Sequence, residues 1–267
     1  MRGERRRPVR SLSQLPPAVL EICIDGVASA WAAESGGADR VELCANLPEG
    51  GTTPSAGLIR NVRSAFAGGL MVIIRPRGYD FLYSDDEMQM MLHDLRVARD
   101  LGADGVVIGC LTTHGRVDAR NCERLITAAG PLDLTFHRAF DMSRNLGEAL
   151  EDIIALGIKR ILTSGGQPDA PTGASVIADL VRQSAGRASI MPGGGVTEEN
   201  LAQIVRSTGV WEVHLSARQT VRSRMEFRNL HCFMGACSKD HEYEWREASV
   251  EKIRLARTAL TEALALR

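Results

Sequence analysis

Residues 36–44, Gly-Gly-Ala-Asp-Arg-Val-Glu-Leu-Cys, place a helix-stopping glycine pair directly before a short β-type run. The phrase Gly-Ala-Asp returns at residues 102–104, again just before a β-type run. Further glycine stops precede later runs at Gly130, Gly157, Gly186 and Gly209. This alternation of helix stop and strand is typical of parallel strands joined by crossover helices.

Eight such runs alternate with longer amphipathic stretches along the chain. They predict strands at residues 20–24, 40–44, 70–75, 105–110, 133–136, 160–163, 188–191 and 212–215. Eight units within 267 residues fit a closed TIM-type (β/α)8 barrel, which typically takes ~250 residues. We therefore predict an α/β fold with one barrel domain over residues 18–267 and its working site at the C-terminal strand ends. An open, doubly wound sheet is the alternative.

The composition narrows the function. The net charge is -1, with 32 basic and 33 acidic residues, which gives no electrostatic footprint for nucleic acid or an anionic membrane surface. No stretch approaches the ~20 apolar residues of a membrane span, and no secretory leader is evident. Small-molecule or metal chemistry in the cytoplasm is therefore expected. The six cysteines are expected to be reduced thiols.

Residues 1–17 differ from the rest, with five arginines among the first ten residues and a proline pair before the first strand. We interpret this segment as a disordered basic tail. A mitochondrial transit peptide is the alternative, although the prolines oppose an amphipathic helix.

The first two predicted strands carry the same phrase, apolar-Glu-apolar-Cys. In Leu20-Glu21-Ile22-Cys23 and Val41-Glu42-Leu43-Cys44, side chains two apart share a face, so each glutamate lies with a cysteine. Neighbouring strands could bring Cys23 and Cys44 together near the barrel mouth. The alternative is that both are inert core cysteines.

Two arginines, Arg75 and Arg77, follow the third predicted strand. A buried arginine requires a partner, and we expect Glu21 and Glu42 to supply it. The four side chains would then form either an anion clamp for a substrate or a salt-bridged plug in the barrel.

The fifth strand ends in His137, with Asp141 four residues later. A histidine at a strand end could act as a general base or metal ligand, with its tautomer fixed by a nearby acid. A satisfied structural histidine is the alternative.

Glycine-rich or small-residue turns follow the last three strands. Backbone N–H groups in such turns can bind phosphate, which predicts an anion site where the turns meet. Its candidate residues are Gly165, Gly194, Gly195, Ser216 and Arg218. The alternative is that the glycines serve only tight turns.

A long polar segment, residues 217–247, separates the last strand from the final helix. Loops of this length are usually functional or contact a partner subunit. Its Cys232 and Cys237 lack the spacing of a zinc knuckle, so we expect loop thiols and, at His231 and His241, surface histidines.

Several phrases together resemble the CutC copper homeostasis family from about Leu20 to the C-terminus. Besides the strand phrases above, they are Glu49-Gly50-Gly51-Thr52-Thr53-Pro54-Ser55, Ile74-Arg75-Pro76-Arg77-Gly78, Thr135-Phe136-His137-Arg138-Ala139-Phe140-Asp141 and Met191-Pro192-Gly193-Gly194-Gly195. The resemblance, nearest to the animal branch, implies a cytoplasmic homo-oligomer, a dimer or tetramer, with presence in the nucleus left open. It also implies Cu(I) binding by cysteines, which fall on Cys23 and Cys44. A soft monovalent ion selects thiolates.

One residue departs from the family pattern. The usual Arg-Gly-Gly-Asp is Arg77-Gly78-Tyr79-Asp80 here. If the replaced glycine has positive φ, we expect the loop to be redrawn and Asp80 to move.

Three functions remain open at this point. The first is a copper homeostasis protein that binds Cu(I) through Cys23 and Cys44. The second is an enzyme on a phosphorylated or carboxylated metabolite, with Arg75 and Arg77 as anion clamps and His137 and Glu42 as acid and base. The third is an oligomeric scaffold.

Overall fold

The computed structural model describes residues 18–229, 231–232, 234 and 242–266. The tail expected at residues 1–17, together with Cys237 and His241, lies outside the described residues.

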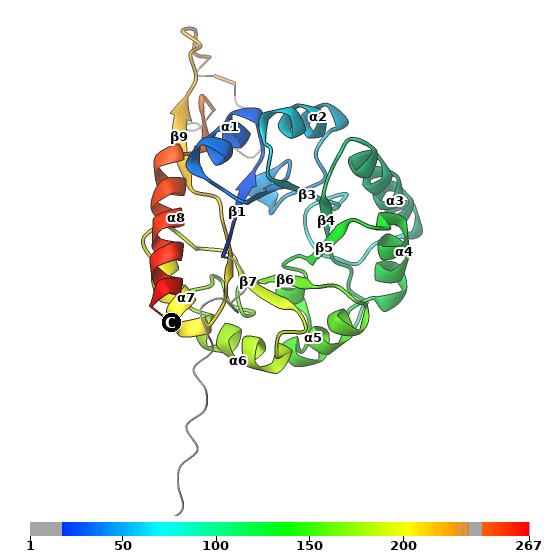
Figure 1. The fold of residues 1–267 in the computed structure, drawn as a ribbon. Coiled ribbons are helices and arrows are strands. Elements are labelled where there is room, and N and C mark those ends of the chain that lie inside the picture. The colour runs from blue at the N-terminus through cyan, green and yellow to red at the C-terminus, as the bar shows by residue number, and fades with distance from the viewer. Residues whose placement is uncertain (1–17, 230, 233, 235–241, 267) are drawn as a thin grey trace, which may run out of the picture.

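Parallel strands form a ring inside a layer of helices (Figure 1). The strands are β1 (Val19–Ile24), β2 (Arg40–Leu43), β3 (Gly69–Ile73), β4 (Gly105–Ile108), β5 (Asp133–Phe136), β6 (Arg160–Thr163), β7 (Ser189–Pro192) and β8 (Glu212–Leu215). Their order is β7-β6-β5-β4-β3-β2-β1-β8, so the last strand returns beside the first. The predicted (β/α)8 barrel is confirmed.

One helix follows each strand and covers the outside of the ring. The helices are α1 (Val27–Gly36), α2 (Ala56–Ala65), α3 (Asp85–Asp100), α4 (Ala119–Ala129), α5 (Leu146–Ala155), α6 (Ala174–Ser184), α7 (Leu201–Thr208) and α8 (Val250–Ala265). Short 3-10 turns, η2 (Leu47–Glu49) and η3 (Phe140–Met142), lie at the strand ends. The helices bury the apolar strand residues that point outward, such as Ile22, Leu43 and Val72.

The third and fourth predicted strands extend two residues beyond β3 and β4. Beyond Ile73 the backbone bonds to a loop, because the N–H of Arg75 donates to Oγ1 of Thr53 at 2.9 Å. Beyond Ile108, the carbonyl of Cys110 accepts from the N–H of Asp118. Apolar composition alone does not reveal these exits from the sheet.

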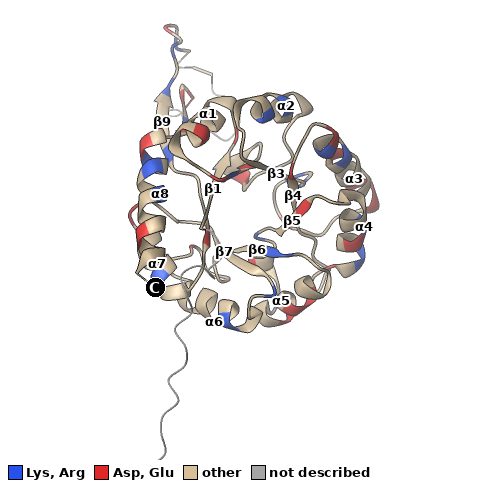
Figure 2. Cartoon of the chain, in the orientation of Figure 1, with Lys and Arg blue, Asp and Glu red and all other residues tan. Residues whose placement is uncertain are grey.

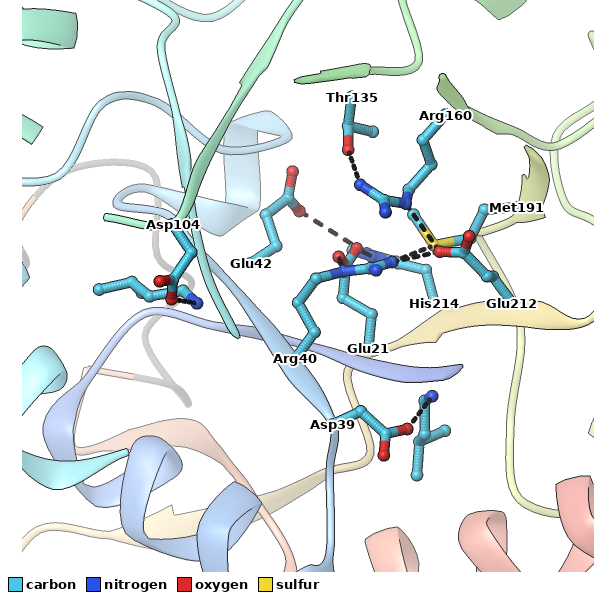
Figure 3. Close-up of polar contacts among 12 residues, drawn as sticks. Glu21, Asp39, Arg40, Glu42, Asp104, Thr135, Arg160, Met191, Glu212 and His214 are labelled. Atoms are coloured by element: carbon cyan, nitrogen blue, oxygen red, sulfur yellow. Dashed lines mark hydrogen bonds and ion pairs between the residues drawn. The ribbon is translucent and has the colours of Figure 1, made fainter. Parts of the chain in front are cut away.

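The residues that point inward at the strand starts are charged. Glu212 of β8 accepts from Nη2 of Arg40 at 2.6 Å and from Nε of Arg160 at 2.7 Å. Arg40 also pairs with Glu21 of β1, and Arg160 donates to Thr135 of β5 (Figure 3). These five side chains, from five strands, form the interior ionic network.

The segment after β8 contains a hairpin that the sequence reading treated as a loop. Its strands, β9 (Arg218–Arg222) and β10 (Glu244–Ala248), pair antiparallel. The hairpin lies at the rim beside α1, where the N–H of Ala248 donates to Oγ of Ser29 (Figure 1). The polar composition concealed it, because half of its strand residues are exposed and neither strand has a buried apolar face.

Acidic and basic residues are interspersed around the helical layer (Figure 2). Among the described residues, no helix has the length and apolar character to cross a bilayer.

The interior ionic network makes a testable contribution to stability. In Glu212→Ala, Arg40 and Arg160 lose a shared buried carboxylate, and we expect the free energy of unfolding to fall by about 3 to 5 kcal/mol. Urea denaturation followed by circular dichroism measures it. The matched control is Glu151→Ala, whose ion pair with Arg187 is nearly half-exposed and screened by solvent, so its loss should have a much smaller effect on the free energy of unfolding. Equal losses in the two variants would show that the network does not stabilise the barrel.

Candidate functional site

A cavity of about 720 Å³ opens at the C-terminal ends of the strands. Five of the candidate site residues singled out from the sequence line it: Cys23, Glu42, Cys44, Arg75 and His137. This volume is within the range of small-molecule sites, ~300 to 1,000 Å³. We call it the mouth cavity.

Cys23 and Cys44 meet at the floor of the mouth cavity. In the register of β1 and β2, the residue directly beside Cys23 is Glu42, and Cys44 lies two residues further along the chain. Their sulfurs are nevertheless only 3.9 Å apart, and both residues are buried. A carboxylate oxygen of Glu42 completes a group whose ligand atoms lie within 4.8 Å of one another. This Cys-Glu-Cys cluster could hold a metal ion.

The two thiols differ in acidity although they are the same residue type. The hydrogen bond from Cys44, helped by His214, holds the pKa of Cys23 well below its usual value, although burial opposes this. The same bond and burial raise the pKa of Cys44. Burial and the nearby Cys23 raise the pKa of Glu42 to about 8. One thiolate is therefore favoured beside a thiol and a protonated carboxyl group.

His214 of β8 is a site residue that the sequence reading did not assign. Its Nδ1 contacts Glu21 at 2.7 Å, and its Nε2 lies 3.7 Å from Glu42 (Figure 3). Burial lowers its pKa, but the bonds to Cys23 and Glu21 more than offset this and raise it. The alternation Glu212-Val213-His214 on one strand was the available signal, because it places both polar residues on the inward face.

The prediction that Glu21 and Glu42 pair with Arg75 and Arg77 is wrong. Arg75 donates to the main-chain carbonyls of Glu49, Gly51 and Tyr79. Arg77 does not line the mouth cavity, and it pairs with Glu87 and with Asp80, an acid at the rim of that cavity. The acids expected for them are used deeper in the barrel, where Glu21 binds Arg40 and His214, and Glu42 lies against Cys23. An ionic plug exists, but Arg40 and Arg160 build it.

His137 lines the mouth cavity without the acid expected to orient it. Its Nδ1 accepts from the N–H of Ala139 at 3.2 Å, so the neutral ring carries its proton on Nε2. Among the described residues, that Nε2 has no hydrogen-bond partner. Asp141 instead accepts from Arg138, Thr163 and Ser164. Burial and the charge of Arg75 lower the pKa of His137 to about 3.

The turns of the predicted anion site do not surround the mouth cavity. None of Gly165, Gly194, Gly195, Ser216 and Arg218 lines it. After β6, the N–H groups of Ser164 and Gly166 donate to Asp141, and that of Gly165 donates to Thr163. Arg218 lies in β9 and lines a separate cavity. The site stays a prediction, and its donors after β6 already bind an internal carboxylate.

Tyr79, which stands where the family pattern has a glycine, has a left-handed backbone. Its φ is 66°, its side chain is exposed, and its carbonyl accepts from Arg75. Tyr79 thus adopts a conformation that glycine adopts without strain, and in this loop Asp80 pairs with Arg77.

The fold and the cluster define a class of protein: a (β/α)8 barrel with two thiols and a carboxyl group that could bind a metal at its mouth. Residues 18–219 match the CutC family model. The chain belongs to the CutC family of copper homeostasis proteins.

Relatives of this chain occur in animals and bacteria. The human copper homeostasis protein cutC homolog is 47% identical, over 88% of this chain and 86% of its own length. A CutC family protein of Chromobacterium violaceum is 49% identical, over 92% and 99%. The crystal structure of CutC from Streptococcus agalactiae superposes with a TM-score of 0.72 at 35% identity, over 74% of this chain and 98% of that one.

A more distant structure shares only the barrel. Thiamine phosphate pyrophosphorylase from Pyrococcus furiosus superposes with a TM-score of 0.58 at 17% identity, over 92% of this chain and 97% of that one.

The environment of His137 predicts its titration. We expect the ring to stay neutral, with its proton on Nε2, from pH 7 down to pH 5. Histidine ¹H–¹⁵N correlation spectra, assigned with His137→Gln, measure this; a ring that gains a proton in that interval would contradict the burial argument.

The same shift makes stability depend on pH. The pKa of His137 is 6.5 in the unfolded chain and about 3 in the folded one, so the unfolded state binds the proton more tightly. The neutral ring therefore costs no folding free energy above pH 6.5, and the free energy of unfolding falls as the pH drops from 6.5 toward 3. His137→Gln should flatten that part of the stability curve.

Proposed function

We propose that the protein binds Cu(I) as cargo through the thiolates of Cys23 and Cys44. The observation that carries this proposal is the 3.9 Å separation of the two sulfurs at the floor of the mouth cavity. Thiolates bind a metal at roughly 2.3 Å, so two sulfurs up to about 4.6 Å apart can share one ion. Both cysteines are free rather than disulfide-bonded.

The surroundings favour a soft ion over a hard one. Met71, Ile73 and Val107 form a buried cluster with the two cysteines, and the partly buried Leu47 packs against this cluster. An apolar shell limits the access of water, and thiolate ligands select Cu(I) over ions that prefer oxygen. Glu42, with its raised pKa, offers a mostly protonated carboxyl group, so the two sulfurs are the principal ligands.

The location and assembly of the protein follow from this proposal and from the family resemblance. A Cys pair binds Cu(I) only when reduced, which supports the expected cytoplasmic location. A homo-oligomer, dimer or tetramer, is proposed on the family resemblance alone.

Copper binding should depend on this one pair of cysteines. In a Cys23→Ser, Cys44→Ser double variant, loss of both ligands should weaken Cu(I) binding by at least ~100-fold. The measurement is anaerobic competition with a chromogenic Cu(I) chelator, with circular dichroism to confirm the fold.

Two matched double variants separate the site from other thiols. Cys232→Ser, Cys237→Ser removes the cysteines after β9, and Cys110→Ser, Cys122→Ser removes the buried pair that lies against each other outside the mouth cavity. Both should bind Cu(I) as the parent does. Parental affinity in the Cys23, Cys44 variant would overturn the proposal.

A further inference from the structure

A buried cation in the mouth cavity has no carboxylate partner among the described residues. Arg75 is only 4% exposed, and its terminal nitrogens donate to three main-chain carbonyls. Its guanidinium also lies 4.9 Å from the centre of the Phe81 ring. Carbonyls and an aromatic face stabilise a cation without neutralising it. Within the described part of the chain, Nε of Arg75 lacks a hydrogen bond of normal geometry, and the Tyr83 hydroxyl is the polar group near the Arg75 side chain.

A second buried donor lines the same cavity. His137 is 3% exposed, and the bond to Ala139 fixes its neutral tautomer with the proton on Nε2. That N–H has no acceptor in the described part of the chain. A buried donor without an acceptor loses the hydrogen bond it makes with water, so a ligand that supplies an acceptor would be favoured.

The other charges around the mouth cavity are already paired. Arg138 pairs with Asp141, and Asp80 with Arg77. Glu42 lies beside Cys23 and Cys44, and its carboxyl group is 3.7 Å from Nε2 of His214. The charge of Arg75 is thus left for a negatively charged ligand.

We propose that the mouth cavity binds a small organic acid whose carboxylate is received by Arg75 and by the Nε2–H of His137. The volume of about 720 Å³ suits a small molecule, and Ile73, Phe81 and Leu162 line it with apolar surface for a hydrocarbon part. The copper site uses sulfur atoms, so the organic acid is a separate ligand with its own donors.

A carboxylate fits this site better than a phosphate. Phosphate sites in barrels use several free backbone N–H groups in the late turns. Here Asp141 accepts from Ser164 and Gly166 in the turn after β6. Two side-chain donors, one of them charged, match the two oxygens of a carboxylate.

The test is a titration of the metal-free full-length protein with pyruvate, succinate and benzoate at millimolar concentration. The corresponding uncharged amides serve as matched ligands. Ligand-observed NMR gives the dissociation constants, and histidine ¹H–¹⁵N spectra follow Nε2 of His137. At least one carboxylate should bind and shift the His137 resonance, and its amide should bind about tenfold more weakly or worse.

Two variants assign the donors. Arg75→Gln should weaken carboxylate binding by about tenfold or more, and His137→Phe should weaken it to a smaller extent. If thermal unfolding shows that Arg75→Gln does not fold, His137→Phe carries the test. Arg187→Gln, an arginine substitution on the outer surface, is the control and should bind as the parent does.

Three results would overturn the proposal: no carboxylate shifts His137, acids and amides bind equally, or the folded variants bind like the parent. The titration contains no copper, so its failure leaves the Cu(I) proposal standing, and the reverse is also true.

Discussion

The interior ionic network is the constraint on which the rest of the barrel depends. Glu21, Arg40, Arg160 and Glu212 come from four strands and meet where water is excluded. Each charge is tolerable there only while its partners are in place, because an unpaired buried charge costs several kcal/mol. A slip of one residue in any of these strands would turn its charge toward the apolar helical layer. The network therefore fixes the register of the strands that carry the site.

Protonation at the mouth follows from this network. Arg40 and His214 hold the pKa of Glu21 well below its usual value, although burial opposes them, while Glu42, one strand away and without an arginine partner, has its pKa raised to about 8. Two buried glutamates thus take opposite charge states because their neighbours differ. Glu21 fixes His214, and His214 in turn favours the thiolate of Cys23. The layer that closes the barrel therefore also favours a thiolate at the mouth.

The sequence predicted the features of the fold and site that depend on residues close together in the chain. Glycine stops and apolar runs gave the strands, and alternation along β1 and β2 placed Glu21, Cys23, Glu42 and Cys44 on the inward face. The prediction that Glu21 and Glu42 pair with Arg75 and Arg77 was wrong. Alternation along a strand shows which side chains point inward, but it does not show which of them lie at the same depth in the barrel.

The role of His214 was missed for a related reason. It contacts Glu21, 193 positions away in the sequence, and that contact exists only because closure of the ring brings β8 beside β1. The points at which the chain leaves β3 and β4 were also not predicted. They depend on hydrogen bonds to loops, and the sequences of the two strands do not reveal those bonds.

The polar interior is a costly way to fill a barrel. Replacing a buried ionic cluster with well-packed apolar residues is often neutral or stabilising, so stability alone does not account for two glutamates, two arginines and a histidine along the axis. Departures from a simple apolar core are expected where side chains must be held in a fixed geometry for function. Different strands supply different groups to the cavity. The two thiols and His214 come from β1, β2 and β8, and the chain just beyond β3 and β5 carries Arg75 and His137, whose Nε and Nε2 have no hydrogen-bond partner among the described residues. One cavity therefore contains the two sulfurs of the proposed Cu(I) site and, apart from them, the two nitrogen donors of the proposed organic-acid site.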